Sequence, residues 1–161
     1  MALKSMGCEC VFASELREDL RKLYVINFPE MKGKTDSGIN KIEGDITAVN
    51  PHDIPAHDIL CAGFPCQPFS QAGKRLGFND DKDRGNLFYN ICAIIDAHRP
   101  RYVLLENVAN LKGHDNGNTW KTIKEALETR RYKVKEELLS PHQFGIPQHR
   151  RRIYIVCENE D

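Results

Sequence analysis

The sequence lacks the cysteine spacings that mark zinc sites and dithiol redox centres. Its six cysteines include no C-x-x-C pair and no paired spacing of the zinc type. This argues against a structural metal site and against a thioredoxin-like function. Disulfides are not expected in a reducing compartment. We therefore expect most of the cysteines to be small buried apolar residues, and Cys61, Cys92 and Cys157 fit this best because each lies in an apolar run.

The chain also lacks a long apolar run and an excess of charge of either sign. No stretch approaches the ~18 apolar residues of a membrane span, and residues 1–5 begin no apolar segment of signal-peptide length. Lys+Arg and Asp+Glu each number 23, which argues against a free-standing, non-specific nucleic-acid binder. An intracellular, cytoplasmic protein without membrane contact is the default expectation.

What the sequence does contain is an alternation of strand and helix patterns. Apolar and period-2 runs predict strands over residues 8–13, 41–47, 57–64, 102–105, 132–139 and 152–157. Helical spacing of apolar residues predicts helices over residues 16–27, 87–95 and 120–127. The expected N-caps are Ser14 for the first helix and Asn118 or Thr119 for the last. The alternation predicts an α/β fold with a mainly parallel sheet, and 161 residues suffice for one domain.

A long loop interrupts this pattern over residues 65–84, which are rich in proline, glycine and polar residues. Loops of about twenty residues are uncommon in compact domains and are usually functional. Cys66 stands near its start, between Pro65 and Pro68. The two prolines stiffen the backbone and fix where the sulfur points. From these residues alone, Cys66 is equally well interpreted as a nucleophile or as a buried loop cysteine.

Polar or reactive groups follow four of the predicted strands: Glu15, Asp45, Cys66 and Glu106. In open α/β sheets, ligands bind beyond the carboxyl ends of the strands, so four such groups indicate a site. Glu106 comes after four apolar residues, and partial desolvation would raise its pKa and suit it to proton donation. The alternative is a helix-cap or surface glutamate.

Two arginines alternate where the last strand is expected to begin. Arg150 and Arg152 are two residues apart, so in a strand both would point to one face. Paired guanidinium groups suit an anion or a polarised carbonyl. The alternative, which charge alone favours, is a solvated surface.

Five segments of the sequence resemble the DNA (cytosine-5)-methyltransferase family, and the bacterial restriction–modification members most closely. They are GDIT, GFPCQPFSQAGKRLGF, RGNLFYNI, LLENVANLKGHDNGNTW and FGIPQHRRRIYIV, in the family's order between about Gly7 and Cys157. A single P-C-Q is weak support, but P-C-Q, E-N-V and Q-x-R-x-R at these spacings are very specific. The resemblance implies a partial Rossmann-like, S-adenosylmethionine-dependent methyltransferase sheet with flanking helices, in a single, incomplete catalytic domain over residues 1–161.

The resemblance also implies a role for each matching residue at the DNA. Cys66 would attack C6 of a target cytosine flipped out of double-stranded DNA. Glu106 would bind N3 and the exocyclic amine and help to protonate N3. Arg150 and Arg152 would flank the base, Arg152 near its O2. The loop that closes over the DNA would carry Gln67, Ser70 and Lys74.

The remaining matches imply an S-adenosylmethionine site and no metal. Glu15 would hold the ribose hydroxyls, and Asp45 would accept a hydrogen bond from the adenine amine. Ile46 would pack against the adenine ring. Pro65 and Leu87 would also line the cofactor.

The sequence departs from the family pattern at both ends. It contains no F-x-G-x-G, the turn after the family's first strand, and no target-recognition region follows its Q-x-R-x-R segment. We therefore expect a sheet without its first strand, little or no methyl transfer by this chain alone, and self-association or a complementing chain. The alternative function is a non-catalytic methyltransferase remnant that binds DNA or a partner chain. A thiol redox protein is a poor third.

Overall fold

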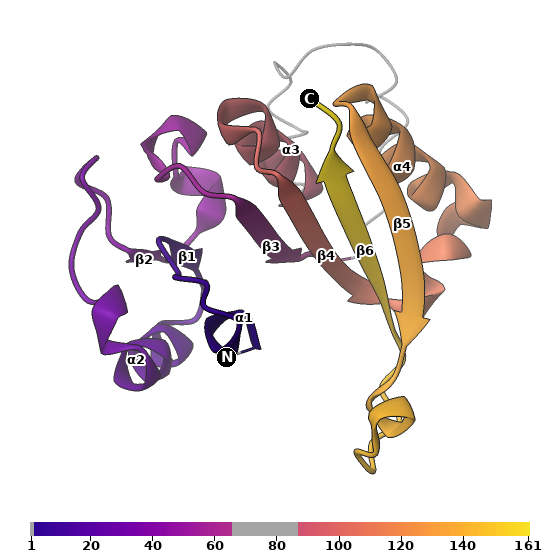
Figure 1. The fold of residues 1–161 in the computed structure, drawn as a ribbon, viewed down its shortest axis with the longest axis horizontal. Helices are drawn as coiled ribbons and strands as arrows, with labels where there is room; N and C mark the ends of the chain where they lie inside the picture. Colours follow the sequence, from indigo (N-terminus) through magenta and orange to yellow (C-terminus); the bar gives the residue numbers. More distant parts are fainter. Residues whose placement is uncertain (1, 66–86) are drawn as a thin grey trace. The chain divides into compact units, whose positions relative to one another are not determined.

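A computed structural model describes residues 2–65 and 87–161 of the chain (Figure 1). Four residues with predicted roles lie outside the described residues: Cys66, Gln67, Ser70 and Lys74. The chain divides into two compact units, Met1–His57 and Asp58–Asp161. None of the helices in the described ranges has the length and apolar character needed to cross a membrane.

The first unit is built on a short parallel sheet. Its helices and strands are α1 (Ala2–Ser5), β1 (Ala13–Ser14), α2 (Glu18–Asn27) and β2 (Ile42–Glu43). Three short 3₁₀ helices cover Pro29–Met31, Ile46–Ala48 and Pro51–Asp53. β1 and β2 pair in parallel, so their carboxyl ends lie at one edge of this sheet.

Both strands of the first unit are shorter than the sequence pattern predicts. The chain turns directly after β2, because the carboxylate of Asp45 accepts a hydrogen bond from the backbone N–H of Thr47 and caps a 3₁₀ turn. The prediction that Ser14 is the N-cap of the first helix is wrong, since its hydroxyl donates to the carbonyl of Gly44 at 2.9 Å. The helix begins instead after Arg17, which makes no side-chain cap.

The described part of the second unit is a four-stranded sheet with two helices against one face (Figure 1). Its elements are β3 (Ile59–Gly63), α3 (Leu87–His98), β4 (Tyr102–Val108), α4 (Asn118–Thr129), β5 (Tyr132–Leu139) and β6 (Arg152–Asn159). Short 3₁₀ helices cover Ala109–Lys112, His114–Gly117 and Pro141–Phe144. The strand order is β3-β4-β6-β5.

This larger sheet is mixed, so the expectation of a mainly parallel sheet is wrong here. β3 and β4 are parallel, whereas β6 is antiparallel to both β4 and β5. The reason is the connection over residues 140–151, which leads from β5 into β6 without a crossover helix. The predicted caps of α4 are also wrong, because the N-cap is Gly117, whose φ of 86° suits glycine.

The core lies between the sheet and the two helices. Along β4 and β6, alternate residues such as Val103, Leu105, Ile153 and Ile155 are buried, and the residues between them are more exposed. This is the period of two that a strand covered on one face requires. The buried set packs with side chains of α3 and α4 in one cluster. The other set, which includes Glu106, points to the face on which neither α3 nor α4 packs, referred to as the open face.

Two of the three cysteines expected in the core are found there. Cys92 and Cys157 are buried, and burial raises the pKa of each thiol to about 12. The expectation for Cys61 is wrong, because this residue is exposed. Its neighbours in β3, Leu60 and Ala62, pack against the core, so alternation turns Cys61 to the open face.

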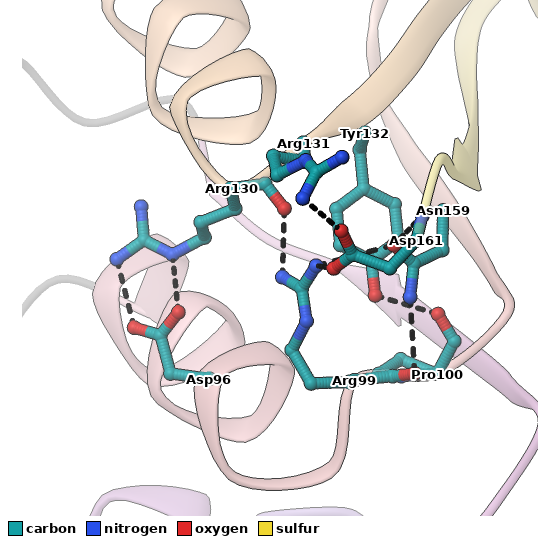
Figure 2. A network of polar contacts seen from close by, with 8 residues as sticks. All are labelled: Asp96, Arg99, Pro100, Arg130, Arg131, Tyr132, Asn159 and Asp161. Atoms are coloured by element: carbon teal, nitrogen blue, oxygen red, sulfur yellow. Dashed lines mark hydrogen bonds and ion pairs between the residues drawn. The ribbon is translucent and has the colours of Figure 1, made fainter.

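A network of polar contacts ties the helices to the start of β4 and β5 (Figure 2). Arg130 contacts both carboxylate oxygens of Asp96, at 2.8 and 2.9 Å, and joins the end of α4 to α3. Arg99 donates to the carbonyl of Arg130 at 2.7 Å. The hydroxyl of Tyr132 donates to the buried carbonyl of Pro100 at 2.5 Å. The network therefore fixes the end of the unit opposite to the carboxyl end of β4.

We expect Tyr132→Phe to lower the free energy of unfolding by about 1–2 kcal/mol, because it leaves a buried carbonyl without its donor. Equilibrium denaturation in urea measures the change. Tyr154→Phe is the matched control, since the hydrogen bonds seen among the described residues include none from the Tyr154 hydroxyl. Equal losses in the two variants would contradict the prediction.

We also expect Cys92 and Cys157 to resist iodoacetamide at pH 8 in the folded chain. A thiol with a pKa near 12 is only ~10⁻⁴ thiolate at that pH, and burial blocks the reagent. Mass spectrometry of the labelled peptides measures each rate, with the exposed Cys61 as internal comparison and the denatured chain as control. Labelling of Cys92 as fast as that of Cys61 would show that the core is not formed as described.

Candidate active site

The carboxyl end of β4 and the start of β6 bring Glu106 and Arg152 together. Glu106 is opposite Tyr154 in the antiparallel ladder, so Arg152 is its diagonal neighbour on the same face. The Nε of Arg152 lies 2.9 Å from Oε1 of Glu106, and the two side chains are 22% and 37% exposed. This partly buried ion pair fixes the direction of both side chains on the open face.

The other carboxylate oxygen of Glu106 lies beside the end of β3. Gly63 is opposite Glu106 in the parallel ladder, and a Cβ placed on Gly63 would lie 3.5 Å from Oε2 of Glu106. The carboxylate is therefore flanked by the guanidinium of Arg152 on one side and by the backbone of β3 on the other. A polar substrate group that reached it would approach from the open face of the sheet.

Asn107 connects β4 to the chain that leaves β3. Its Nδ2 donates to the carbonyl of Phe64 at 2.8 Å, and its Oδ1 accepts from the backbone N–H of Val108 at 2.7 Å. Pro65, predicted to line the cofactor, follows this contact and is exposed. Asn107 was not among the predicted site residues, although it is the middle residue of E-N-V. Its place beside Glu106 at a strand end was the signal for it.

The described residues on either side of the segment 66–86 lie close together. The ring centroids of Phe64 and Phe88 are 5.5 Å apart. Leu87, the other residue predicted to line the cofactor, begins α3 and packs partly buried against the core. The helix and the end of β3 are thus held to each other at this point.

Arg150 differs from Arg152 in its setting. β6 begins at Arg152, so the strand alternation used in the prediction does not extend to Arg150, which is exposed. Its backbone N–H donates to Oγ of Ser140 at 3.1 Å, and Nδ1 of His142 lies 2.8 Å from the same oxygen. The ring of His149 is 4.4 Å from that of His142. These contacts hold the connection that precedes β6, whose first residue is Arg152.

In the first unit, the predicted cofactor residues lie just after the two parallel strands. Glu15 follows β1, and its Oε1 accepts from the backbone N–H of Arg17 at 2.9 Å. Asp45 and Ile46 follow β2 at the same edge, Asp45 exposed and Ile46 partly so.

The carboxylate of Asp45 is held ready to accept hydrogen bonds. It accepts from the hydroxyl and the backbone N–H of Thr47, at 2.8 and 2.9 Å. These bonds lower the pKa of Asp45, so the group is ionised at neutral pH. Glu15 and Asp45 therefore place two carboxyl groups after neighbouring parallel strands, where ligands bind in open α/β sheets. Among the described residues, no three His, Cys, Asp or Glu side chains group as metal ligands would.

Solved structures share this fold. The S. pombe Dnmt2 methyltransferase matches with a TM-score of 0.71 at 23% identity, over 99% of this chain and 46% of that one. A mutant of Spodoptera frugiperda DNMT2 matches with a TM-score of 0.69 at 28% identity, again over 99% and 46%. The α/β methyltransferase fold expected from the sequence is thereby confirmed.

Curated relatives are much closer in sequence. The type II methyltransferase M.HhaI of Haemophilus parahaemolyticus is 44% identical over all of this chain and 46% of its own length. M.HaeII of Haemophilus aegyptius is 49% identical over 97% of this chain and 45% of its own length. The chain thus spans a little under half the length of these relatives.

The family model described as C-5 cytosine-specific DNA methylase matches residues 1–161. The match covers β4 with its E-N-V residues and β6 with Arg152, the two strands that form the ion pair. With the whole chain matched and relatives at 44–49% identity, this protein belongs to the C-5 cytosine-specific DNA methylase family.

Proposed function

We propose that this chain carries the catalytic centre of a restriction–modification DNA methyltransferase that transfers a methyl group from S-adenosylmethionine to C5 of cytosine. Its two units would together form one catalytic domain, and the DNA substrate implies an intracellular location. The observation that supports this most is the ion pair of Glu106 and Arg152 at the carboxyl end of β4. It lies beside the end of β3, and Cys66 follows that strand by three residues.

The proposed chemistry begins at Cys66, because C5 of cytosine is by itself a poor nucleophile. The Cys66 thiolate adds to C6 of the flipped base, and protonation at N3 lets the ring electrons collect at C5. When bound, S-adenosylmethionine supplies an electrophilic methyl group. After C5 has taken the methyl group, the C5 proton passes to water as the Cys66 thiolate leaves C6, which restores the C5=C6 bond, and N3 returns its proton to Glu106.

Glu106 and Arg152 would act on the Watson–Crick edge of the base. The carboxyl group of Glu106 would bind the exocyclic amine and deliver the proton to N3. Arg152 would orient that carboxyl through Nε and approach O2 of the cytosine. Arg150 would flank the base from the connection before β6. Gln67, Ser70 and Lys74 would contact the DNA from the loop.

The cofactor would be held by the strand ends of the first unit. The ionised Asp45 suits the adenine amine, and Glu15 suits the ribose hydroxyls. Ile46 offers an apolar contact to the ring, and Pro65 and Leu87 would complete the lining.

We further propose that methyl transfer needs a complementing polypeptide. Among the described residues, the strands form two sheets, β1-β2 and β3-β4-β6-β5, and β3 is at the end of the larger one. The residues of β3, ILCAG, are largely apolar, and such an edge is a template for another strand. The sequence also contains no F-x-G-x-G segment. A partner that supplies a strand and this turn would fit both features.

The covalent step can be tested in a chimaera that replaces the matched stretch of the H. aegyptius relative with this chain. DNA with 5-fluorocytosine at the target position blocks loss of the C5 substituent and traps the adduct. We expect an adduct that survives denaturing electrophoresis and requires S-adenosylmethionine. Cys66→Ser should abolish it, and Cys61→Ser, five residues earlier, should not.

No adduct with the intact chimaera would favour the alternative, a non-catalytic methyltransferase remnant. An adduct that persists in Cys66→Ser would assign the nucleophile to another residue.

The need for a complement can be tested with the 161-residue chain on its own. We expect no transfer of tritium from labelled S-adenosylmethionine to cytosine-containing DNA by this chain, and clear transfer by the chimaera. Sedimentation of the chain alone tests whether it associates with a second copy. Transfer by a monomeric chain at the rate of the chimaera would contradict the proposal.

A further inference from the structure

We propose that Asn107 is a positioning residue for the reaction. It holds the chain that leads into Cys66 at a fixed place relative to the carboxyl group of Glu106. This inference rests on the proposed function, because it takes Cys66 as the nucleophile and Glu106 as the group that binds the same base.

The side chain of Asn107 lies on the opposite face of the sheet from Glu106. It follows Glu106 directly in β4, so the two side chains point to opposite faces of the sheet. Glu106 is on the open face with Arg152, and Asn107 is 2% exposed on the face that the helices cover. One strand therefore carries both the carboxyl group and the contact that fixes the neighbouring chain.

Both ends of the Asn107 amide are used, which defines its orientation. The Val108 N–H is a donor and lies 2.7 Å from the oxygen, so the nitrogen faces the carbonyl of Phe64 at 2.8 Å. Since a carbonyl only accepts, this assignment satisfies both partners. An oxygen in place of that nitrogen would face another oxygen inside the protein.

The contact with Asn107 fixes the position of Phe64, from which the chain continues to Pro65. The last pair of the parallel ladder is Gly63 with Glu106, and the Asn107 side chain continues the link between the strands one residue further. The ring of Phe64 is also held, because it is buried and lies 5.5 Å from the ring of Phe88. Phe64 is thus fixed at its carbonyl and at its side chain.

Cys66 is two residues beyond Phe64 in the sequence. Two residues span at most about 7 Å, so a displaced carbonyl at Phe64 displaces the start of the segment that carries the thiol. A misplacement of about 1 Å between reacting atoms can cost roughly 10²-fold in rate. Loss of the Asn107 contact should therefore slow bond formation to C6 more than it weakens DNA binding.

The test is the rate of adduct formation by Asn107→Asp in the chimaera, on 5-fluorocytosine DNA under single-turnover conditions from pH 5.5 to 8.5. At pH 8 we expect a rate about 10–100-fold below that of the unsubstituted chimaera, with the Kd for DNA changed less than about threefold. The rate of Asn107→Asp divided by the rate of the unsubstituted chimaera should rise as pH falls. A buried carboxyl has a raised pKa, and its protonated form regains a donor for the Phe64 carbonyl.

Two controls separate positioning from a general loss of structure. Asn107→Leu keeps the size but has no donor, so its rate should be low at every pH without recovery. Thr119→Val removes another buried polar group, whose Oγ1 lies 2.7 Å from Nδ1 of His114, and should leave the rate of adduct formation unchanged. Denaturation curves check the folding of each variant, and Asn107→Ser replaces Asn107→Asp if the latter does not fold.

The outcomes distinguish this inference from the proposed function. If the unsubstituted chimaera forms no adduct, the proposed function fails and the inference falls with it. If it forms the adduct and Asn107→Asp matches its rate at pH 8, only the inference is overturned. A slow Asn107→Asp whose ratio does not change with pH, or a loss of DNA binding as large as the loss of rate, would assign Asn107 a purely structural role and also overturn it.

Discussion

Strand β4 is hydrogen-bonded on both sides, in parallel to β3 and in antiparallel to β6, and this double pairing is the constraint on which the candidate site depends. It sets Gly63 and Tyr154 opposite Glu106 and leaves Arg152 as the diagonal neighbour. Because the strand has a period of two, the same register that buries Leu105 in the core turns Glu106 to the open face. The packing of the core therefore also sets the face of the sheet to which Glu106 points.

Much of the larger sheet could be predicted from the sequence, because its patterns are long and unambiguous. β5 has the predicted bounds, Tyr132–Leu139, and its burial alternates from Tyr132 to Glu137. β3 (Ile59–Gly63) lies within the predicted residues 57–64. β4 begins at the predicted Tyr102 but continues past Leu105 to Val108, so Glu106 lies inside the strand and not after it. The positions of Glu106 and Arg152 near strand ends followed from the same patterns. Their roles in the reaction stay predictions.

What could not be predicted depends on contacts between residues far apart in the sequence. The antiparallel direction of β6 is seen in its pairing with β4 and β5, which the strand pattern alone does not show. Ser14 and Thr119 have the chemistry of N-caps but use their hydroxyls elsewhere, on Gly44 and His114. The exposure of Cys61 depends on which face of β3 the helices cover. Asn107 resembles an ordinary strand-end residue until the carbonyl of Phe64 is placed beside it.

The antiparallel entry of β6 has a consequence for how such a protein can vary. Arg152 is the first residue of its strand, so its place is set by the ladder with β4 and not by the path of residues 140–151. A connection between antiparallel neighbours tolerates changes in length and sequence at little cost. Phe144 and Ile146 are exposed in this connection, so a change of either side chain leaves the ladder that holds Arg152 on the carboxylate in place. The position of the arginine and the surface of the connection can therefore be altered separately.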